Sequence, residues 1–279
     1  MKIRTDLALE LRQMNRHVEG VRCRERECGK ITVTEIIIET ESAAQKIGRP
    51  RGRYVTVSFP PLTDHTHIPG EGWEHISEPL SSMLPPEGTI LVAGLGNMSV
   101  TPDALGPRAV SMIPATRHIM AELERSMGKG GMRSCAAVAP GVLGQTGVEA
   151  AELIRGVCRT VKPSAVIVID ALAARGLEHL GCTVQLNDTG IHPGSGVGSR
   201  RPAISQKELG VPVIAMGVPT VVDAATLAYD LCGMESGAGG MIVTPGEIDL
   251  LIDRAARLLA LAVNQALHPS IDPQELISM

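Results

Sequence analysis

Two apolar runs, each followed by an aspartate, constrain the fold of this chain more than any other feature of its sequence. Residues 90–93 (ILVA) lead into a glycine turn at 94–96 (GLG), and Asp103 follows in the turn PDALGP. Residues 165–169 (AVIVI) lead directly into Asp170. Continuous apolar runs of this length are typical of strands that are buried on both faces of a parallel sheet. Because functional sites in such sheets lie beyond the carboxyl ends of the strands, we expect both aspartates to face one cleft.

Segments with strand and helix patterns alternate from residue 89 to residue 232. This alternation predicts an α/β fold with a doubly wound, mostly parallel sheet, helices on both faces and additional N-terminal strands. Because neither a repeat nor a linker interrupts the pattern, we expect residues 1–279 to form a single domain. The expected strands are 31–39, 53–59, 89–95, 135–139, 165–169, 182–187, 211–217 and 241–244. The expected helices are 105–127 with an interruption near Pro114, 147–161, 171–180, 221–231 and 246–267, the last with Thr244 as its N-cap.

The composition excludes several classes of partner. The chain has only one Trp, two Tyr and one Phe, so it lacks the exposed rings on which nucleic-acid bases stack. The net charge is −4 and the basic residues are scattered, so we expect no direct nucleic-acid partner. No apolar stretch is long enough to span a membrane, and no apolar segment follows Met1. The six scattered cysteines are expected to be reduced thiols of a cytoplasmic protein, with no zinc site.

The two aspartates are the best candidates for chemistry. Asp103 alone also fits a helix cap whose carboxylate accepts hydrogen bonds from backbone amides. Asp170 follows five apolar residues, so its carboxyl group is expected to be at least partly buried, where ionisation is costly. Two carboxylates in one cleft repel each other, so one holds a proton at neutral pH while the other is ionised. Such a pair divides the acid and base roles toward a bound water molecule.

The glycine turn also permits a dinucleotide-binding interpretation. A complete fingerprint needs a third glycine at position 99, which is Ser99, and no acidic residue closes a second strand at the required distance. The alternative is that Gly94 and Gly96 allow the backbone to turn sharply after the strand. A serine nucleophile has little support, because the chain contains no G-x-S-x-G elbow.

The loop at 188–201 (DTGIHPGSGVGSRR) is the natural rim of a cleft. Its first three residues form the tripeptide of pepsin-like proteases, but those proteases are all-β and do not fit the predicted α/β pattern. His192 is open to three interpretations: a metal ligand, an acid or base, or an ordinary loop residue. The histidines at 65, 67 and 75 favour a solvated loop, since no third metal ligand lies nearby. We therefore expect neither a metal nor a cofactor.

Many blocks of the sequence together closely resemble the germination proteases of spore-forming Gram-positive bacteria. The order and spacing agree from Ile3 to near the C-terminus, so the resemblance rests on far more than one short motif. The blocks are GLGNMSVTPDALGP, APGVLGQTGVEAAELIRGV, VIDALAARGLEHL, QLNDTGIHPGSGVGSRR, VPVIAMGVPTVVDAATL, MIVTPGEID and NQALHPSID.

The resemblance implies an endopeptidase that degrades small acid-soluble spore proteins early in germination. It implies a homotetrameric, self-processing zymogen in the cytoplasm of the forespore or spore core. It also implies a fold similar to the hydrogenase maturation endopeptidases and an aspartic-type mechanism with Asp103 and Asp170 as the catalytic pair. Asn97, Asp188 and His192 are further candidate cleft residues.

The resemblance also implies where the zymogen cuts itself. Members of the family cut after an acidic residue and before an apolar residue that is followed by Ala, and Asp6-Leu7-Ala8 has this pattern. We therefore expect self-cleavage between Asp6 and Leu7, which releases residues 1–6 as a propeptide. Two alternatives remain: a hydrogenase-maturation-type endopeptidase that recognises nickel, and a non-enzymatic module that binds a nucleotide or phosphate at the glycine turn.

Overall fold

The computed structural model describes residues 5–14, 18–64, 72–119, 132–194, 201–233 and 240–277. Its centre is one nine-stranded sheet in the order β1-β2-β3-β7-β8-β6-β4-β5, with β9 paired to β8. The strands are β1 Val21–Cys28, β2 Ile31–Ile38, β3 Gly52–Ser58, β4 Ile90–Gly94, β5 Cys135–Val138, β6 Ala165–Ala174, β7 Thr183–Asn187, β8 Val213–Asp223 and β9 Ile242–Val243.

The predicted α/β fold is confirmed. Strands β5, β4, β6 and β8 are parallel to one another and form one end of the sheet order. The N-terminal strands β1, β2 and β3 extend the same sheet as an antiparallel meander. Strand β7 joins the two parts, because it pairs antiparallel with both β3 and β8.

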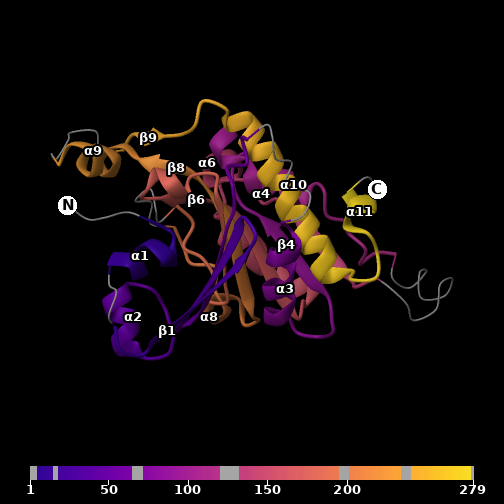
Figure 1. Cartoon of the computed structure of the whole chain (residues 1–279). Coiled ribbons are helices and arrows are strands. Elements are labelled where there is room, and N and C mark those ends of the chain that lie inside the picture. The colour runs from indigo at the N-terminus through magenta and orange to yellow at the C-terminus, as the bar shows by residue number, and fades with distance from the viewer. Residues whose placement is uncertain are drawn as a thin grey trace.

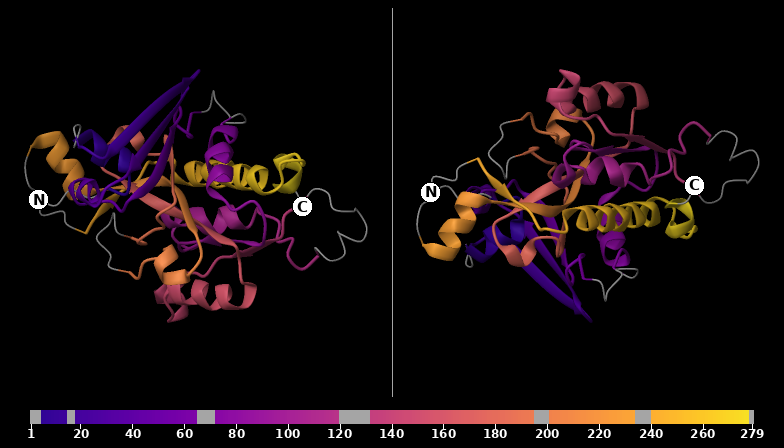
Figure 2. Two further views of the ribbon diagram at one scale, coloured as in Figure 1. Left: turned by 90° about the horizontal axis from the view of Figure 1, so that it is seen from below. Right: turned by 90° about the horizontal axis from the view of Figure 1, so that it is seen from above.

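Helices cover both faces of the sheet, as Figures 1 and 2 show. Along β4 the side chains alternate, so Ile90 and Val92 pack toward one face and Leu91 and Ala93 toward the other. The first face is covered by α3 Glu74–Met83, α4 Leu105–Val110 and α10 Ile248–Leu267, and the second by α7 Ala150–Val161 and α8 Gln206–Leu209. Smaller helices complete the fold: α1 Ala8–Met14, α2 Glu41–Ile47, α6 Leu143–Thr146, α9 Ala224–Cys232 and α11 Pro273–Ile277.

The predicted helix at 171–180 is wrong. Strand β6 continues to Ala174, and only a short 3-10 turn, η2 Leu177–His179, follows. The reason is tertiary: β8 is also longer than predicted, and it pairs with β6 as far as Ala174 opposite Val222. The ladder therefore satisfies backbone groups that a helix would otherwise have satisfied internally. This extension of β6 carries part of the candidate site.

Other boundaries also differ from the prediction. The helix expected at 105–127 ends at Val110, and residues 120–131 lie outside the described residues. Helix α10 begins after Glu247, and Thr244 does not cap it but donates a hydrogen bond to the carbonyl oxygen of Thr220. Strand β1 was missed, since its mostly exposed, charged side chains give no apolar pattern.

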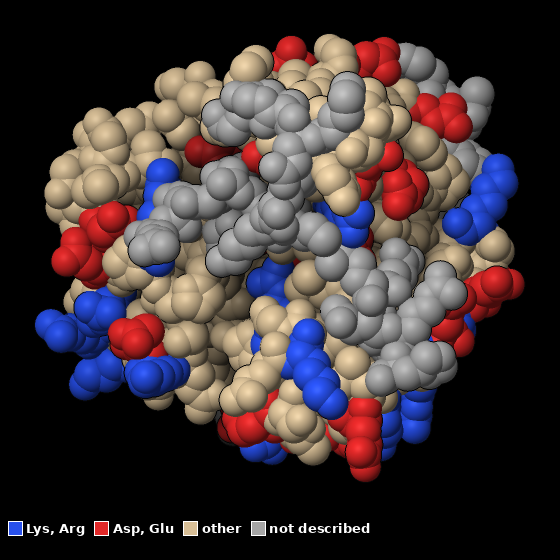
Figure 3. Space-filling model, turned by 90° about the vertical axis from the view of Figure 1, so that its left-hand side faces the viewer, with Lys and Arg blue, Asp and Glu red and all other residues tan. Residues whose placement is uncertain are grey.

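One face of the molecule shows how charged side chains are distributed there. On the face in Figure 3, basic and acidic side chains are interspersed rather than gathered into a stripe of one sign. Among the described residues, no helix combines the length and the apolar character that crossing a membrane requires.

Candidate active site

Asp103 is positioned by the turn that follows β4. After Gly94 the chain stays beside β6 for one more residue, since the Leu95 N–H donates to the carbonyl of Ile169 over 2.8 Å. Gly96 then adopts a φ of 122°, and a side chain there would overlap the main-chain oxygen of Asp103. The Asn97 N–H donates to Asp103 Oδ2 over 2.8 Å. The glycine turn is therefore shaped around Asp103, which ends the short 3-10 helix η1 Thr101–Asp103.

The sequence predicted that Asp170 lies at the end of a strand, but in the structure it lies inside β6. Strand β4, however, ends opposite Ile169, so Asp170 is the first residue of β6 beyond the carboxyl end of its neighbour. On the other side of β6, Asp170 pairs with Gly217 of β8, which has no side chain to place beside the carboxyl group. Asp170 is 6% exposed, and its Oδ1 accepts a hydrogen bond from the Ala171 N–H over 2.9 Å.

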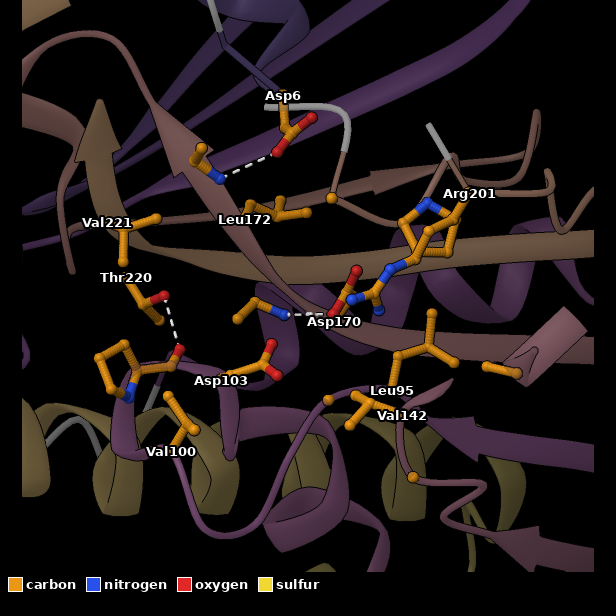
Figure 4. A pocket seen from close by; sticks show the side chains of 18 of the residues that line it. Asp6, Leu95, Val100, Asp103, Val142, Asp170, Leu172, Arg201, Thr220 and Val221 are labelled. Atoms are coloured by element: carbon orange, nitrogen blue, oxygen red, sulfur yellow. Dashed lines mark hydrogen bonds between the residues drawn. The ribbon is translucent and has the colours of Figure 1, made fainter. Parts of the chain in front are cut away.

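Asp103 and Asp170 line one cavity of about 270 Å³. Figure 4 shows both carboxyl groups pointing into it, one from η1 below and one from β6 above. Arg201 also reaches the cavity, and among its described lining residues it is the only basic one. The walls are largely apolar and come from Leu95, Val100, Val142, Leu172 and Val221. An apolar wall around a few polar groups is the usual character of a ligand site.

The environment raises the pKa of both carboxyl groups. Burial raises the pKa of Asp170 well above its ordinary value, and the negative charges of Asp103 and Asp6 raise it further. Burial also raises the pKa of Asp103, but the hydrogen bond from Asn97 and the charge of Arg201 oppose this shift. The proton therefore favours Asp170, the more deeply buried partner, and Asp103 is the carboxylate that ionises first.

The other candidate residues lie around this cavity rather than in it. The Asn97 side chain accepts hydrogen bonds from the Ser99 N–H and from Gln145 Nε2, and it stabilises the loop that holds Asp103. Asp188 is exposed and accepts a hydrogen bond from the Arg53 N–H over 2.8 Å. It is not among the described residues that line either this cavity or its neighbour. His192 lines the neighbouring cavity of about 40 Å³.

The histidine hypotheses gain no support from the described chain. His65 and His67 lie outside the described residues, and His75 lies in α3. The described side chains contain no group of three or more His, Cys, Asp or Glu that is arranged to hold a metal ion. The space beside Gly96 is filled by the backbone of Asp103, which favours the turn interpretation over a phosphate cradle.

The N-terminal segment, residues 5–8, lies in the same cleft, which sequence reasoning did not foresee. The Asp6 N–H donates to the carbonyl of Ala173 over 2.8 Å, and the Ala173 N–H donates to Asp6 Oδ2 over 2.9 Å. Leu7 is completely buried against Leu172 and Val222, which contributes about 1.5–3 kcal/mol to holding the segment. Asp6 thus lines the cavity together with the two candidate catalytic aspartates.

Gln185, in β7, fixes this segment through two hydrogen bonds. Its Nε2 donates to the carbonyl of Asp6 over 2.8 Å, and its Oε1 accepts a hydrogen bond from the Ala8 N–H. Gln185, Gly217 and Asp170 form one row across β7, β8 and β6. The sequence did hold a signal for Gln185, a polar residue inside the apolar strand CTVQLN, whereas nothing in the local pattern singled out Arg201.

Comparison with protein-family models matches residues 2–234 to the model described as germination protease. The chain belongs to the germination protease family. It is 40% identical to the germination protease of Caldanaerobacter subterraneus subsp. tengcongensis, over 98% of this chain and 97% of that protein. It is 35% identical to the germination protease of Clostridium tetani, over 100% of this chain and 99% of that protein. It is 41% identical to the germination protease of Priestia megaterium, over 82% of this chain and 65% of that protein.

Family membership makes this chain a peptidase of spore germination that acts on protein substrates. A solved structure, the NiFe hydrogenase maturation protease HycI from Thermococcus kodakarensis KOD1, is similar with a TM-score of 0.40 and 19% identity, over 67% of this chain and 97% of that one.

Proposed function

We propose that this germination protease is a two-aspartate endopeptidase of small acid-soluble spore proteins, made as a zymogen that cuts its own Asp6–Leu7 bond. One observation carries the proposal: Asp103 and Asp170 share a largely apolar cavity in which both pKa values are raised. The N-terminal segment in the same cleft supports the zymogen, because its Asp6 carboxylate lines that cavity.

In the proposed mechanism Asp103 is the base and Asp170 is the acid. Ionised Asp103 takes a proton from a water molecule, whose oxygen bonds to the carbonyl carbon, while Asp170 gives its proton to the carbonyl oxygen. The carbon–nitrogen bond of the resulting diol then breaks. The leaving nitrogen takes the proton held by Asp103, and one hydroxyl returns a proton to Asp170. Both aspartates thereby regain their starting states.

Further parts of the proposal rest on the family resemblance. We propose one domain over residues 1–279, with 1–6 as the propeptide, and a homotetramer in the cytoplasm of the forespore. Exposed apolar side chains on α9, on β9 and at the residue before β9 are consistent with a contact between copies; they are Tyr229, Leu231, Met241 and Ile242.

The function is tested by incubating the purified chain with a small acid-soluble spore protein and analysing the products by mass spectrometry. We expect cleavage after Asp or Glu and before an apolar residue, and a processed enzyme whose first residue is Leu7. Cleavage that requires nickel and trims a single C-terminus would instead support the maturation-type alternative. Thermal stabilisation by nucleotides without any proteolysis would support the binding-module alternative.

The pH dependence of cleavage follows from the two raised pKa values. The reaction needs Asp103 ionised and Asp170 protonated, so kcat/KM is expected to be bell-shaped. The acid limb lies above the ordinary aspartate pKa of 3.8, because burial raises the pKa of Asp103. The alkaline limb follows the pKa of Asp170, which lies further above 3.8. A profile measured on one peptide that stays flat through the acidic range would contradict the assignment.

A further inference from the structure

The edge of β6 beyond Asp170 holds the N-terminal segment of the chain. Strand β4 ends opposite Ile169, so it does not cover the last residues of β6 on that side. Asp6 occupies this edge, where its backbone N–H and its carboxylate each form a hydrogen bond with Ala173. Addition of an extended segment to a free strand edge is a common mode of peptide binding, in which the backbone supplies affinity and side-chain pockets supply specificity.

Gln185 sets the position of the side chain that precedes the cut. Because it binds the carbonyl of Asp6 and the N–H of Ala8, it holds the Asp6–Leu7 bond from both sides. The side chain of residue 6 is thereby directed to the boundary of the two neighbouring cavities, and it lines both of them. A substrate held in the same way presents its corresponding side chain at this boundary.

Arg49 stands on the far side of that boundary. It follows α2, and its Nη2 donates to the carbonyl of Thr5 over 2.8 Å. The same nitrogen lies 3.9 Å from Asp6 Oδ1, and the two side chains are 21% and 15% exposed. Its buried Nε has no hydrogen-bond partner among the residues that the structure describes. The adjoining cavity of about 40 Å³ has room for a further small group.

We infer that Arg49 selects the acidic side chain before the cleaved bond. The guanidinium group forms a fork that matches a carboxylate, and here one N–H of the fork is still available. The 3.9 Å separation leaves space for a side chain one methylene longer than Asp. The subsite thus accepts Glu at least as well as Asp, and it discriminates against uncharged side chains. The inference rests on the proposed self-cleavage after Asp6.

Arg201 is the alternative cation in this region, but its charge is directed to the catalytic pair. It lowers the pKa of both Asp103 and Asp170. Arg49, in contrast, lines the neighbouring cavity together with Gln185 and Asp6. The two arginines therefore have separate roles: Arg201 acts on the reacting carboxyl groups and Arg49 on the side chain of the substrate.

The chain carries its own substrate, so the inference is tested by self-cleavage of full-length variants. We expect Asp6→Asn to slow the cut after residue 6 by about tenfold or more, since it keeps an acceptor for Ala173 but removes the charge. Asp6→Glu is expected to be cut at least as fast as the wild type. In an Arg49→Gln background, all three side chains at position 6 are expected to be cut at similar rates. Mass spectrometry of timed samples gives each rate.

Arg51→Gln is the matched control. Arg51 lies two residues further on, is largely exposed, and has Glu41 at 4.0 Å, so its loss is expected to preserve the preference for an acidic residue 6. A preference that persists in Arg49→Gln would overturn the inference while leaving the proposed function intact. A wild-type chain that never cuts after Asp6 would overturn the proposed self-processing, and this inference with it.

Discussion

Asp170→Asn is expected to lower kcat/KM at least about a thousandfold, because the variant keeps the shape of the carboxyl group but loses the proton that it transfers. Asp103→Asn is expected to cause a loss of similar size, since an amide cannot take a proton from water. The double variant is expected to be little worse than either single variant, because residues that act as a unit are not additive. The rates are measured on one peptide with an acidic residue before an apolar one.

Stability separates a catalytic effect from simple unfolding. Burial raises the pKa of Asp170 in the folded chain above its ordinary value of 3.8. The stability that protonated Asp170 contributes is therefore fully present below about pH 3.8, and it is lost as the pH rises through the pKa of Asp170 in the folded chain. Asp170→Asn removes this loss, so at neutral pH its free energy of unfolding is expected to equal or exceed that of the wild type. Near-normal cleavage by either single variant would refute the catalytic assignment.

The sequence predicted the central strands and the two aspartates because these depend on local patterns. Buried parallel strands are continuous apolar runs, and a carboxylate at the end of such a run stands out. The prediction failed at residues 171–180, where a helical composition is overridden by pairing between β6 and β8. It failed at β1 for the opposite reason, since a strand with mostly exposed, charged side chains carries no apolar alternation.

The remainder of the candidate site depends on contacts between distant segments. Asp6 was predicted as a cutting site, but its place beside Ala173 depends on hydrogen bonds to a segment 167 residues away. Arg49 follows a small helix of the antiparallel part of the fold, and only the assembled sheet places it beside the N-terminal segment. No local sequence pattern predicts such long-range contacts, so these residues are identified as part of the site only from the folded structure.

Gly96→Ala is expected to destabilise the chain by about 3 kcal/mol or more and to abolish most of its activity. Gly96 has a φ of 122°, which side chains rarely adopt, and a methyl group there would overlap the main-chain oxygen of Asp103. The backbone on both sides of the clash is fixed, because the Asn97 N–H donates to that same oxygen and to the Asp103 carboxylate. Relief of the overlap therefore has to move the proposed base.

Gly156→Ala provides the matched control for this prediction. Gly156 is exposed in the middle of α7, and a methyl group there meets no other atom within 4 Å. Alanine at this position is expected to stabilise the helix by about 0.5–1 kcal/mol and to leave cleavage unchanged. Urea unfolding gives the two stabilities, and kcat/KM on one peptide gives the two activities. If Gly96→Ala matched Gly156→Ala in both measurements, the turn would not be what positions Asp103, and the tight fit around that carboxylate would have no catalytic role.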